Sequence, residues 1–540
     1  MQLVMRFTVV VILVAILPSV VEAQSSRRRL SLPSCREYTS NTEIGTELAR
    51  IHSEHPTIAR AFAVGSSTEG REIWAMMISL NPDTESNEPE IRIVGGIHGN
   101  ECLSVEMVLR IIEWLIDGYS TDRQVRRLVD ETQFFFVPLI NPDGYSRRWA
   151  RRSNANGVDL NRNLGFAWVD ADGRFNEGPS PFSEVETRMF RDFSQTQNFA
   201  LGLTYHTRAS YVNGPWNYTP HHPPDTTLVQ SIGDAYAGTT GYSAVFGWDW
   251  YNITGDVNDW SLGTRGTLDW TLELRSDTDL QWTQHEASLR RFLAYVFQRV
   301  NGRVTDSRTG EPIAARIELS PEGAPIFTDP RQGDYHRILM PGTYGLTFRA
   351  QGYETRVVPA VTVTADTTTT LDVTLDPLPS GTTEYGFAVN RMTMPHAVDN
   401  GSYSTSNYHN ETWAWNALGP PDATPYSMSP GGTITIDLGD GFGVLNGPGD
   451  DLRIHSSTAS AERVSVSAAT DQDGPWASIG SGSGTFTIDL ATTPVPEARY
   501  VRLTDTNTGS FNEAFAGYDL DAVEVLTPRP RDVDPDGDAD

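Results

Sequence analysis

The sequence predicts an α/β domain with a mixed central sheet flanked by helices, followed by two all-β sandwich domains. Up to about residue 300, apolar runs of strand length alternate with runs whose apolar residues recur at helical spacing. Beyond that point the helical period is lost, and short alternating strands rich in Thr and Val are separated by Gly and Pro turns. A chain of 540 residues, 38% of them hydrophobic, is long enough to build three such cores.

The α/β part is predicted from its alternating elements. Four apolar strands are expected at residues 91–95, 134–140, 200–205 and 267–274. Helices are expected at residues 101–116 and 182–195, where the apolar residues follow the 3.6-residue period. Ser183 and Glu186 have the spacing of a capping box at the start of the second helix.

The chain begins with a segment typical of export. Arg6 precedes an apolar run, and Ala23 ends it with a small residue suited to cleavage, which predicts a secretory signal peptide and a secreted protein. A membrane anchor is the alternative, but Pro18 interrupts a run that is already short for a membrane span. The expected segments are a signal peptide at 1–23, the α/β domain at 24–300, β-sandwiches at 301–377 and 381–527, and an acidic tail at 528–540.

The charges exclude several classes of function. The 41 basic and 69 acidic residues give a net charge of −28, so we expect no nucleic-acid partner. Every basic residue other than histidine is arginine. The absence of lysine from the sequence excludes phosphate-loop and Schiff-base chemistry that depends on a lysine side chain.

A His and a Glu follow the first predicted strand. In the segment GGIHGNE, His98 and Glu101 are three residues apart at the carboxyl edge of the sheet, and zinc accepts both imidazole and carboxylate ligands. This spacing is common by chance, so it needs a third ligand. His206 follows the third strand and is the candidate, whereas His221 and His222 lie in a Pro-rich loop where a solvated role is the default.

Two further groups of residues are candidates for a binding or catalytic role. The loop after the second strand gathers side chains that suit a small anion such as a carboxylate, although a plain solvated surface is the alternative. These side chains are Arg148, Arg151, Arg152, Asn161, Arg162 and Asn163. Glu273 interrupts the fourth apolar strand, where a carboxylate is costly unless it is paired or functional.

Taken together, these motifs resemble the zinc metallocarboxypeptidases of the carboxypeptidase A, B, N, E and D types over residues 40–300. The resemblance implies one zinc ion per chain, held by His98, Glu101 and His206. It implies that Glu273 is the general base and that Arg152 stabilises the oxyanion. It also implies that the terminal carboxylate of the substrate is bound by Asn161, Arg162 and Tyr251.

The later domains extend the resemblance to the N/E-type subfamily. Residues 301–377 are similar to its transthyretin-like regulatory sandwich, and residues 381–527 look like galactose-binding-like domains, for which carbohydrate or surface binding is a candidate role. In the tail, Asp532, Asp534 and Asp536 match the start of a calcium loop that lacks its later glutamate. We expect a weak calcium site there or a solvated acidic tail.

The resemblance implies a secreted enzyme that hydrolyses the C-terminal peptide bond of peptides and proteins. Asp256 stands where the family usually has a glycine, close to Asn258 in the expected specificity loop, and an added carboxylate predicts a preference for C-terminal Arg or Lys. The alternatives are another zinc amidohydrolase on the same scaffold, acting on cell-wall peptides or acyl-amino acids, and a non-catalytic binding or adhesion protein. The sequence leaves open whether Cys35 pairs with Cys102.

Overall fold

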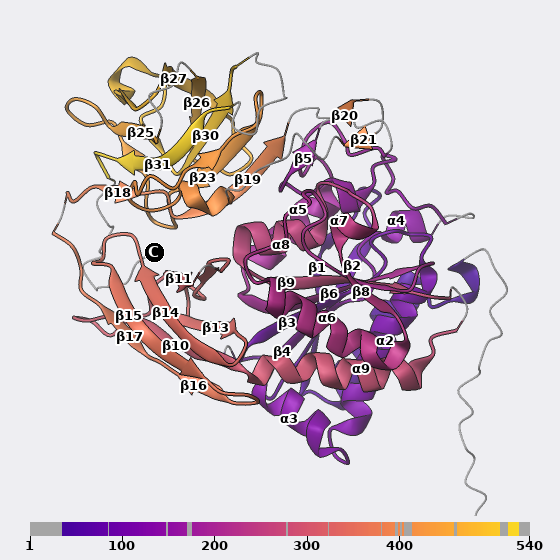
Figure 1. Ribbon diagram of the computed structural model, residues 1–540. Coiled ribbons are helices and arrows are strands. Elements are labelled where there is room, and N and C mark those ends of the chain that lie inside the picture. The colour runs from indigo at the N-terminus through magenta and orange to yellow at the C-terminus, as the bar shows by residue number, and fades with distance from the viewer. Residues whose placement is uncertain are drawn as a thin grey trace, which may run out of the picture.

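The computed structural model is shown in Figure 1. It describes residues 35–84, 86–146, 150–169, 175–276, 279–321, 323–379, 381–394, 398–399, 402–403, 413–457, 462–507 and 517–528. The predicted signal peptide and all but the first residue of the predicted acidic tail lie outside these ranges. Within them, no helix is long and apolar enough to cross a membrane.

An eight-stranded mixed sheet forms the centre of the first part, here called the α/β unit. Its strand order is β1-β2-β4-β3-β6-β9-β7-β8. The bounds are β1 (Ala59–Ser66), β2 (Glu72–Ile78), β3 (Glu90–Val94), β4 (Gln133–Val137), β6 (Phe199–Thr207), β7 (Tyr211–Gly214), β8 (Ser243–Phe246) and β9 (Leu268–Leu274). The four predicted strands are β3, β4, β6 and β9, which are parallel neighbours and buried throughout because helices cover both faces.

Helices pack on both sides of this sheet, with α5 and α8 on one side and α2, α6 and α9 on the other (Figure 1). The helices are α1 (Asn41–Glu54), α2 (Cys102–Gly118), α3 (Arg123–Glu131), α4 (Pro142–Tyr145), α5 (Val185–Gln195), α6 (Thr226–Thr240), α7 (Gly247–Trp250), α8 (Val257–Arg265) and α9 (Trp282–Ala294). Both predicted helices are present, as α2 and α5.

The predicted capping box of α5 is wrong. The N-cap residue is Glu184 and makes no side-chain cap hydrogen bond. The Ser183 hydroxyl instead donates to the Glu184 carboxylate, and the Glu186 carboxylate accepts from Thr68 and Asn154. The Ser183 hydroxyl also accepts a hydrogen bond from Asn163 Nδ2 at 2.9 Å, so both side chains that the local pattern assigned to the helix end have long-range partners.

The second part, the first sandwich, consists of two four-stranded sheets. One contains β13, β10, β16 and β17, and the other has the order β12-β11-β14-β15. The bounds are β10 (Arg299–Asp306), β11 (Arg316–Ser320), β12 (Ile326–Phe327), β13 (Asp334–Ile338), β14 (Gly342–Arg349), β15 (Arg356–Val363), β16 (Thr368–Thr370) and β17 (Val373–Leu375). Its hydrophobic core is separate from that of the rest of the molecule.

The third part, the second sandwich, has a five-stranded sheet of β18, β31, β25, β28 and β22, and a six-stranded sheet in the order β27-β26-β30-β23-β19-β5. Its main strands are β19 (Ala388–Met394), β23 (Thr433–Asp437), β25 (Leu452–Ser456), β26 (Arg463–Ala469), β27 (Ala477–Ser483), β30 (Tyr500–Asp505) and β31 (Asp519–Val525). The short ones are β18 (Glu384–Tyr385), β20 (Val398–Asp399), β21 (Ser402–Tyr403), β22 (Tyr426–Ser427), β24 (Val444–Leu445), β28 (Phe486–Ile488) and β29 (Glu497–Ala498).

One strand of the six-stranded sheet comes from the α/β unit. It is β5 (Trp168–Val169), which pairs in parallel with β19. The hydrophobic core of the α/β unit likewise continues into the second sandwich without a break. The architecture confirms the predicted fold class and adds this shared sheet, which the sequence did not predict.

Candidate active site

The turn after β3 carries two of the three predicted metal ligands. Gly99 lies so close to the chain at Gly144 and Tyr145 that a Cβ atom there would approach both backbones to 2.4 Å. The Ser104 hydroxyl accepts a hydrogen bond from Gly96 N (3.0 Å) and donates one to the carbonyl of Glu101 (2.6 Å). These contacts fix the path of the turn and hold Glu101 at the N-cap of α2.

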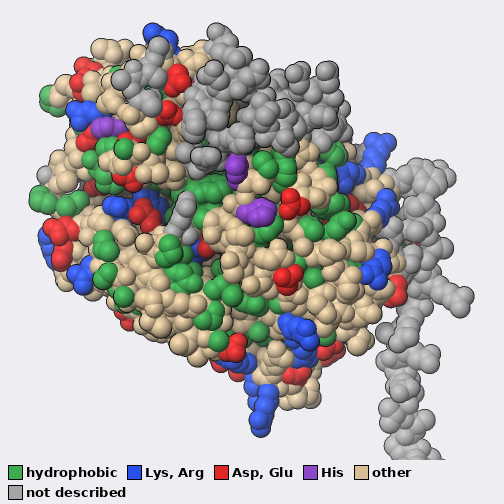
Figure 2. All heavy atoms as spheres, viewed as in Figure 1, with side chains coloured by type: hydrophobic (Ala, Val, Ile, Leu, Met, Phe, Trp, Pro, Cys, Tyr) green, Lys and Arg blue, Asp and Glu red, His purple; other side chains and the backbone are tan. Residues whose placement is uncertain are grey.

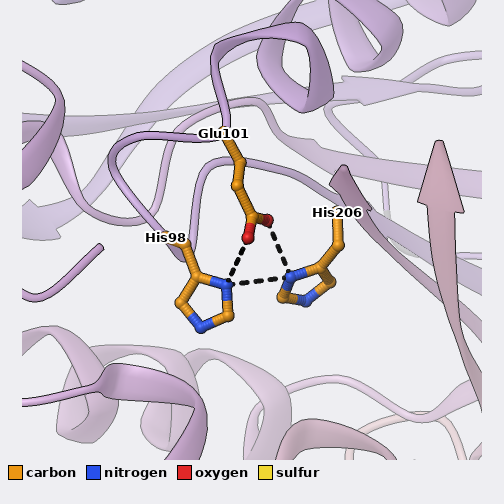
Figure 3. Close-up of side chains that lie close together, drawn as sticks. All are labelled: His98, Glu101 and His206. Atoms are coloured by element: carbon orange, nitrogen blue, oxygen red, sulfur yellow. Dashed lines mark hydrogen bonds and ion pairs between the residues drawn. The ribbon is translucent and has the colours of Figure 1, made fainter. Parts of the chain in front are cut away.

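The three predicted ligands converge on one point, as Figure 3 shows. His98 Nδ1 lies 3.0 Å from Glu101 Oε1, and His206 Nδ1 lies 2.9 Å from Glu101 Oε2. The two Nδ1 atoms are 3.0 Å apart. All three side chains are buried. Among the residues that the structure describes, this is the one group of His, Cys, Asp and Glu with three ligand atoms so close together.

The donor set fits a zinc ion. Zinc with N and O ligands at about 2.0–2.1 Å in tetrahedral geometry places neighbouring ligand atoms about 3.3 Å apart, close to the separations seen here. His206 Nε2 is buried without a hydrogen-bond partner in the described ranges, so this ring is not held by hydrogen bonds at both nitrogens. Two imidazoles and a carboxylate leave a fourth position for a water molecule or a substrate atom, as catalytic zinc sites require.

Electrostatics favour the metal-binding forms of these ligands. Burial lowers the pKa of His206, which keeps the imidazole neutral and able to bind a cation. Burial raises the pKa of Glu101, but the interactions of its carboxylate with His98 and His206, which include hydrogen bonds, outweigh burial, so the net pKa lies below the ordinary value. The carboxylate is therefore ionised in the site.

Asp159 holds the ring of His98, the first predicted ligand, and was not predicted from the sequence. Its Oδ1 lies 3.0 Å from His98 Nε2, the ring nitrogen that does not face Glu101, and its Oδ2 accepts a hydrogen bond from Arg152 Nε (2.8 Å). Carboxylates in this position fix the orientation of a metal-binding histidine. The signal was available, because Asp159 is the lone carboxylate in the stretch RRSNANGVDLNRN.

Arg152 reaches towards the cluster from the same stretch. Its Nη1 lies 3.6 Å from Glu101 Oε1, and its side chain is 35% exposed. One end of the guanidinium is held by Asp159, while the other faces the predicted metal ligands. That arrangement can present a cation to a substrate oxygen beside the metal.

Glu273 stands beside His206 in the sheet. The two residues are register partners on the parallel strands β9 and β6, so their side chains emerge next to each other at the same edge. The Glu273 carboxylate makes no hydrogen bond to the described residues, and burial, with the nearby charge of Glu101, raises its pKa well above the ordinary value. A buried carboxylate with a raised pKa can both accept and return a proton.

Arg162 and Tyr251, two residues of the predicted carboxylate clamp, lie in contact. Arg162, in the short 3₁₀ turn Leu160–Arg162, is buried, and its Nη2 donates to the Tyr251 hydroxyl at 3.3 Å. Its guanidinium carbon lies 4.3 Å from the centre of the Phe175 ring. Within the described residues no carboxylate lies within 4.0 Å of this guanidinium, which leaves it free to pair with an anionic ligand. Asn161 Oδ1 is already used, because it accepts from Val257 N.

The side chains of Asp256 and Asn258 make hydrogen bonds that stabilise the loop that was predicted to set specificity. Asp256 is the N-cap of α8, where its Oδ1 accepts from the backbone N–H groups of Asn258 and Asp259. Its Oδ2 is buried without a hydrogen-bond partner in the described chain, and burial raises its pKa to about 6. The Asn258 amide donates to Asn213 O and accepts from Thr271, so it links α8 to β7 and β9.

Of the other residues that the sequence singled out, those that the structure describes do not lie in the cluster of His98, Glu101 and His206. Arg148 lies outside the described residues, and Arg151 is exposed. Asn163 is fully buried and serves as a loop brace, donating to Glu177 O and Ser180 O. His222 stacks on Phe246 at the surface, away from the cluster.

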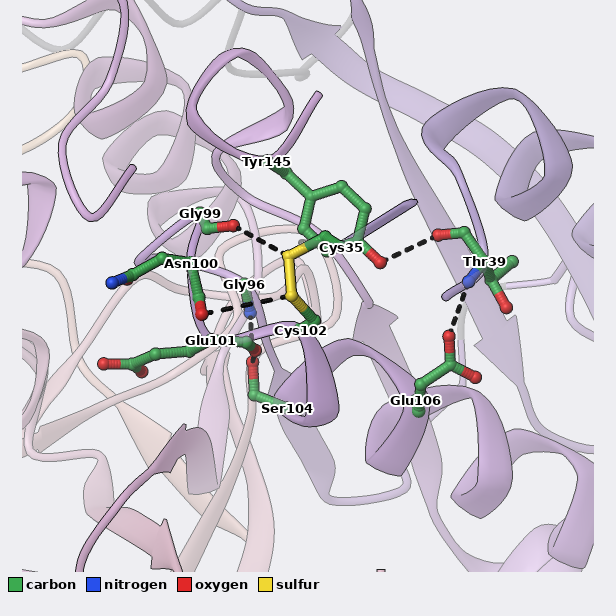
Figure 4. Close-up of a disulfide and its surroundings, with 10 residues drawn as sticks. All are labelled: Cys35, Thr39, Gly96, Gly99, Asn100, Glu101, Cys102, Ser104, Glu106 and Tyr145. Atoms are coloured by element: carbon green, nitrogen blue, oxygen red, sulfur yellow. Dashed lines mark hydrogen bonds between the residues drawn. A yellow bond between two sulfur atoms is a disulfide. The ribbon is translucent and has the colours of Figure 1, made fainter. Parts of the chain in front are cut away.

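Cys35 and Cys102 form a disulfide, which settles the pairing that the sequence left open (Figure 4). Cys102 is the first residue of α2 and follows Glu101 directly. The segment after Cys35 is also held by hydrogen bonds, from Thr39 N to Glu106 (2.7 Å) and from the Tyr145 hydroxyl to Thr39 O (2.9 Å). The N-terminal segment is thus fastened against the ligand turn.

Comparison with known proteins identifies the family. Residues 44–296 match the family model described as zinc carboxypeptidase, and residues 299–376 match the model described as carboxypeptidase regulatory-like domain. The chain is 30% identical over 367 residues to the carboxypeptidase N catalytic chain of Mus musculus, which covers 58% of this chain and 80% of that relative. The protein belongs to the zinc carboxypeptidase family, which confirms the resemblance seen in the motifs.

Other relatives share part of the chain. Carboxypeptidase D of Homo sapiens is 28% identical over 394 residues, covering 63% of this chain, and this chain spans 28% of that relative's length. Carboxypeptidase SOL1 of Arabidopsis thaliana is 27% identical over 350 residues, covering 60% of this chain and 70% of that relative. Among solved structures, carboxypeptidase A from Helicoverpa armigera is 21% identical, with a TM-score of 0.42, covering 50% of this chain and 74% of that one.

Proposed function

We propose that this protein is a secreted, zinc-dependent carboxypeptidase that removes the C-terminal residue from peptides and proteins. The observation that carries the proposal is the convergence of His98, Glu101 and His206 on one point beside Glu273. One zinc ion per chain would be held by these three residues. Secretion is proposed from the N-terminal signal-like segment, and peptide or protein C-termini are the proposed partners.

The chemistry follows from the residues around this point. Zinc, when bound, supplies Lewis acidity that polarises a carbonyl group and makes a water molecule more acidic. Glu273 takes a proton from the attacking water and returns it to the leaving amine, a role that its raised pKa supports. Arg152 donates to the carbonyl oxygen as negative charge develops on it, and loss of such a donor typically costs about 3–4 kcal/mol in the barrier.

Exopeptidase action follows from the clamp. The buried Arg162 guanidinium would pair with the terminal carboxylate of the substrate, with Asn161 nearby and Tyr251 covering it. An internal peptide bond offers no carboxylate for this pairing. Substrates are therefore positioned by their C-terminus, with the last peptide bond at the metal.

The proposed preference for C-terminal Arg or Lys rests on Asp256. One of its oxygens caps α8, and the other is buried without a partner among the described residues. A cationic side chain entering the pocket would pair with that oxygen and favour the ionised carboxylate. Asn258 would shape the same loop through its links to β7 and β9.

The two sandwiches are given accessory roles in this proposal. The first sandwich acts as the transthyretin-like regulatory domain of the N/E-type subfamily, and the second resembles modules that bind carbohydrate or surfaces. Neither contributes a residue to the proposed metal cluster.

Metal analysis with matched variants tests the proposal. The wild-type chain should hold one zinc, His206→Ala should lose zinc and activity, and His222→Ala should keep both because that ring lies outside the cluster. Glu273→Gln should keep zinc and lose nearly all turnover, since the change removes the proton acceptor while preserving shape. Normal zinc content in His206→Ala, or near-normal turnover in Glu273→Gln, would overturn the assignment.

A further inference from the structure

Two loops that border the candidate substrate site rest on the second sandwich. The clamp loop, residues 161–169, carries Asn161 and Arg162. The pocket loop, residues 216–218, holds the aspartates at the start of α8. Figure 2 shows hydrophobic side chains gathered along the seam between the second sandwich and the α/β unit. The contacts across this seam explain how it supports both loops.

The clamp loop becomes part of the second sandwich three residues after Arg162. Met392 N in β19 donates to Gly165 O at 2.8 Å, and the strand β5 then continues the sheet in register with Thr393 and Met394. Between these points, Leu164 N donates to Gly255 O at 3.0 Å, which ties the clamp loop to the residue before Asp256. A shift of β19 would therefore be transmitted both to Arg162 and to Asp256.

The pocket loop is held by an aromatic stack. Trp216 is fully buried, and its ring lies 5.6 Å from that of Phe166 in the clamp loop. On the side of the second sandwich it meets Trp413 at 5.9 Å and Trp415 at 6.2 Å, measured between ring centres. Offset and stacked aromatic pairs of this kind contribute beyond the area they bury.

The residue after Trp216 connects the aromatic stack to the two aspartates at the start of α8. Asn217 N donates to Asp259 Oδ1 and Oδ2, at 2.9 and 3.0 Å, and Asn217 Nδ2 donates to Asp256 Oδ1 at 3.1 Å. The position of Asp256 thus depends on the loop that the tryptophan stack fixes.

A cluster of ion pairs links the two sides of the same seam. Asp473 accepts two hydrogen bonds from Arg191 on α5, at 2.7 and 2.8 Å, and one from Arg391 on β19 at 3.0 Å. The Phe182 ring lies 4.9 Å from the Arg191 guanidinium and 5.2 Å from that of Arg391. Phe182 N donates to Asn163 O at 2.7 Å, so the ion-pair cluster is also connected to the clamp loop.

We propose that the second sandwich is a positioning element for substrate binding, acting through Trp415, Met392 and Asp473 on the clamp and pocket loops. The proposal rests on the proposed function for the identity of the substrate. The predicted ligands His98 and Glu101 lie on the turn before α2, and His206 and Glu273 lie on β6 and β9. None of the seam contacts described above involves these four residues. Loosening the seam should therefore weaken substrate binding and leave the chemical step intact.

Steady-state kinetics of the full-length, zinc-loaded protein test this separation. Trp415→Ala and Asp473→Asn should each raise KM for a peptide with a free C-terminus about tenfold, with kcat within about twofold of wild type. Trp415→Phe should restore most of the loss because it keeps an aromatic ring. Arg453→Ala, on β25 in the other sheet of the same sandwich, is the matched control and should leave KM unchanged.

Hydrogen exchange gives a readout that does not depend on activity. Amides of residues 160–169 should exchange faster in Trp415→Ala and Asp473→Asn than in the control, while those of α2 stay protected and zinc content stays at the wild-type value. Unchanged KM with unchanged exchange would overturn the proposal. A fall in kcat together with loss of zinc would also overturn it, because that pattern indicates general loss of structure. Faster exchange in this segment supports the proposal even if the peptide is not a substrate, so the two proposals fail separately.

Discussion

Removal of the disulfide between Cys35 and Cys102 is predicted to destabilise the α/β unit by about 4 kcal/mol. The two cysteines are 67 residues apart in sequence. For a closed loop of this length, the entropy that the bond removes from the unfolded chain corresponds to about 4 kcal/mol at 25 °C. Because Cys102 directly follows Glu101, the same change should loosen the turn that carries the ligands.

The double variant Cys35→Ser/Cys102→Ser leaves no free thiol and is the direct test. The slowest-exchanging amides of α2 report the opening free energy of the α/β unit separately from the sandwiches. Wild-type protein kept reduced should behave like the variant. Tyr145→Phe removes one hydrogen bond from the same segment and should cost only about 1 kcal/mol. A loss below about 1 kcal/mol in the double variant, or faster exchange confined to residues 35–39, would refute the reasoning.

Three further predictions address pH, specificity and calcium. Burial, aided by the charge of Arg275, lowers the pKa of His285 to about 4. The unfolded chain therefore binds a proton at His285 more readily than the folded chain does. The folded state has its full stability above pH 6.5 and loses stability as the pH falls towards 4. Thermal melts should show about 3 kcal/mol less stability at pH 4 than at pH 7 from this residue, and His285→Gln should remove that part of the pH dependence. Asp256→Asn keeps the cap of α8 but removes the charge. This variant, like Asp256→Gly, should lower kcat/KM for C-terminal Arg relative to C-terminal Phe about tenfold. A parent enzyme that prefers C-terminal Phe would contradict the specificity proposal. Calorimetry of the full chain should reveal no submicromolar calcium site in the tail, and such a site would contradict the expectation for Asp534 and its neighbours.

The sequence predicted the elements whose signals are local. The strands around Ile93, Phe136 and Leu203 read as apolar runs because both faces of a central sheet are buried. His98, Glu101 and His206 could be placed together because the carboxyl ends of parallel strands meet at one edge. The family resemblance then supplied the spacing that links residues far apart in the chain.

The features that the sequence did not predict depend on long-range contacts. Nothing local marks Trp168 as a strand residue, because β5 has two residues and pairs with a strand more than 200 residues later. The pattern of Ser183 and Glu186 favoured a local cap, yet distant partners took both side chains. Asp256 appeared as a pocket charge, and the structure adds that one of its oxygens is committed to α8.

In the proposed carboxypeptidase, Arg162 recognises a free C-terminus beside a zinc site that cleaves the last peptide bond. The most direct test is mass spectrometry of two zinc-containing digests, one with a peptide that ends in a free arginine carboxylate and one with the same peptide as its C-terminal amide. The free peptide should lose single residues from its C-terminus, while the amide should stay intact. Cleavage of the amide at a comparable kcat/KM, or cleavage at internal bonds, would contradict this expectation.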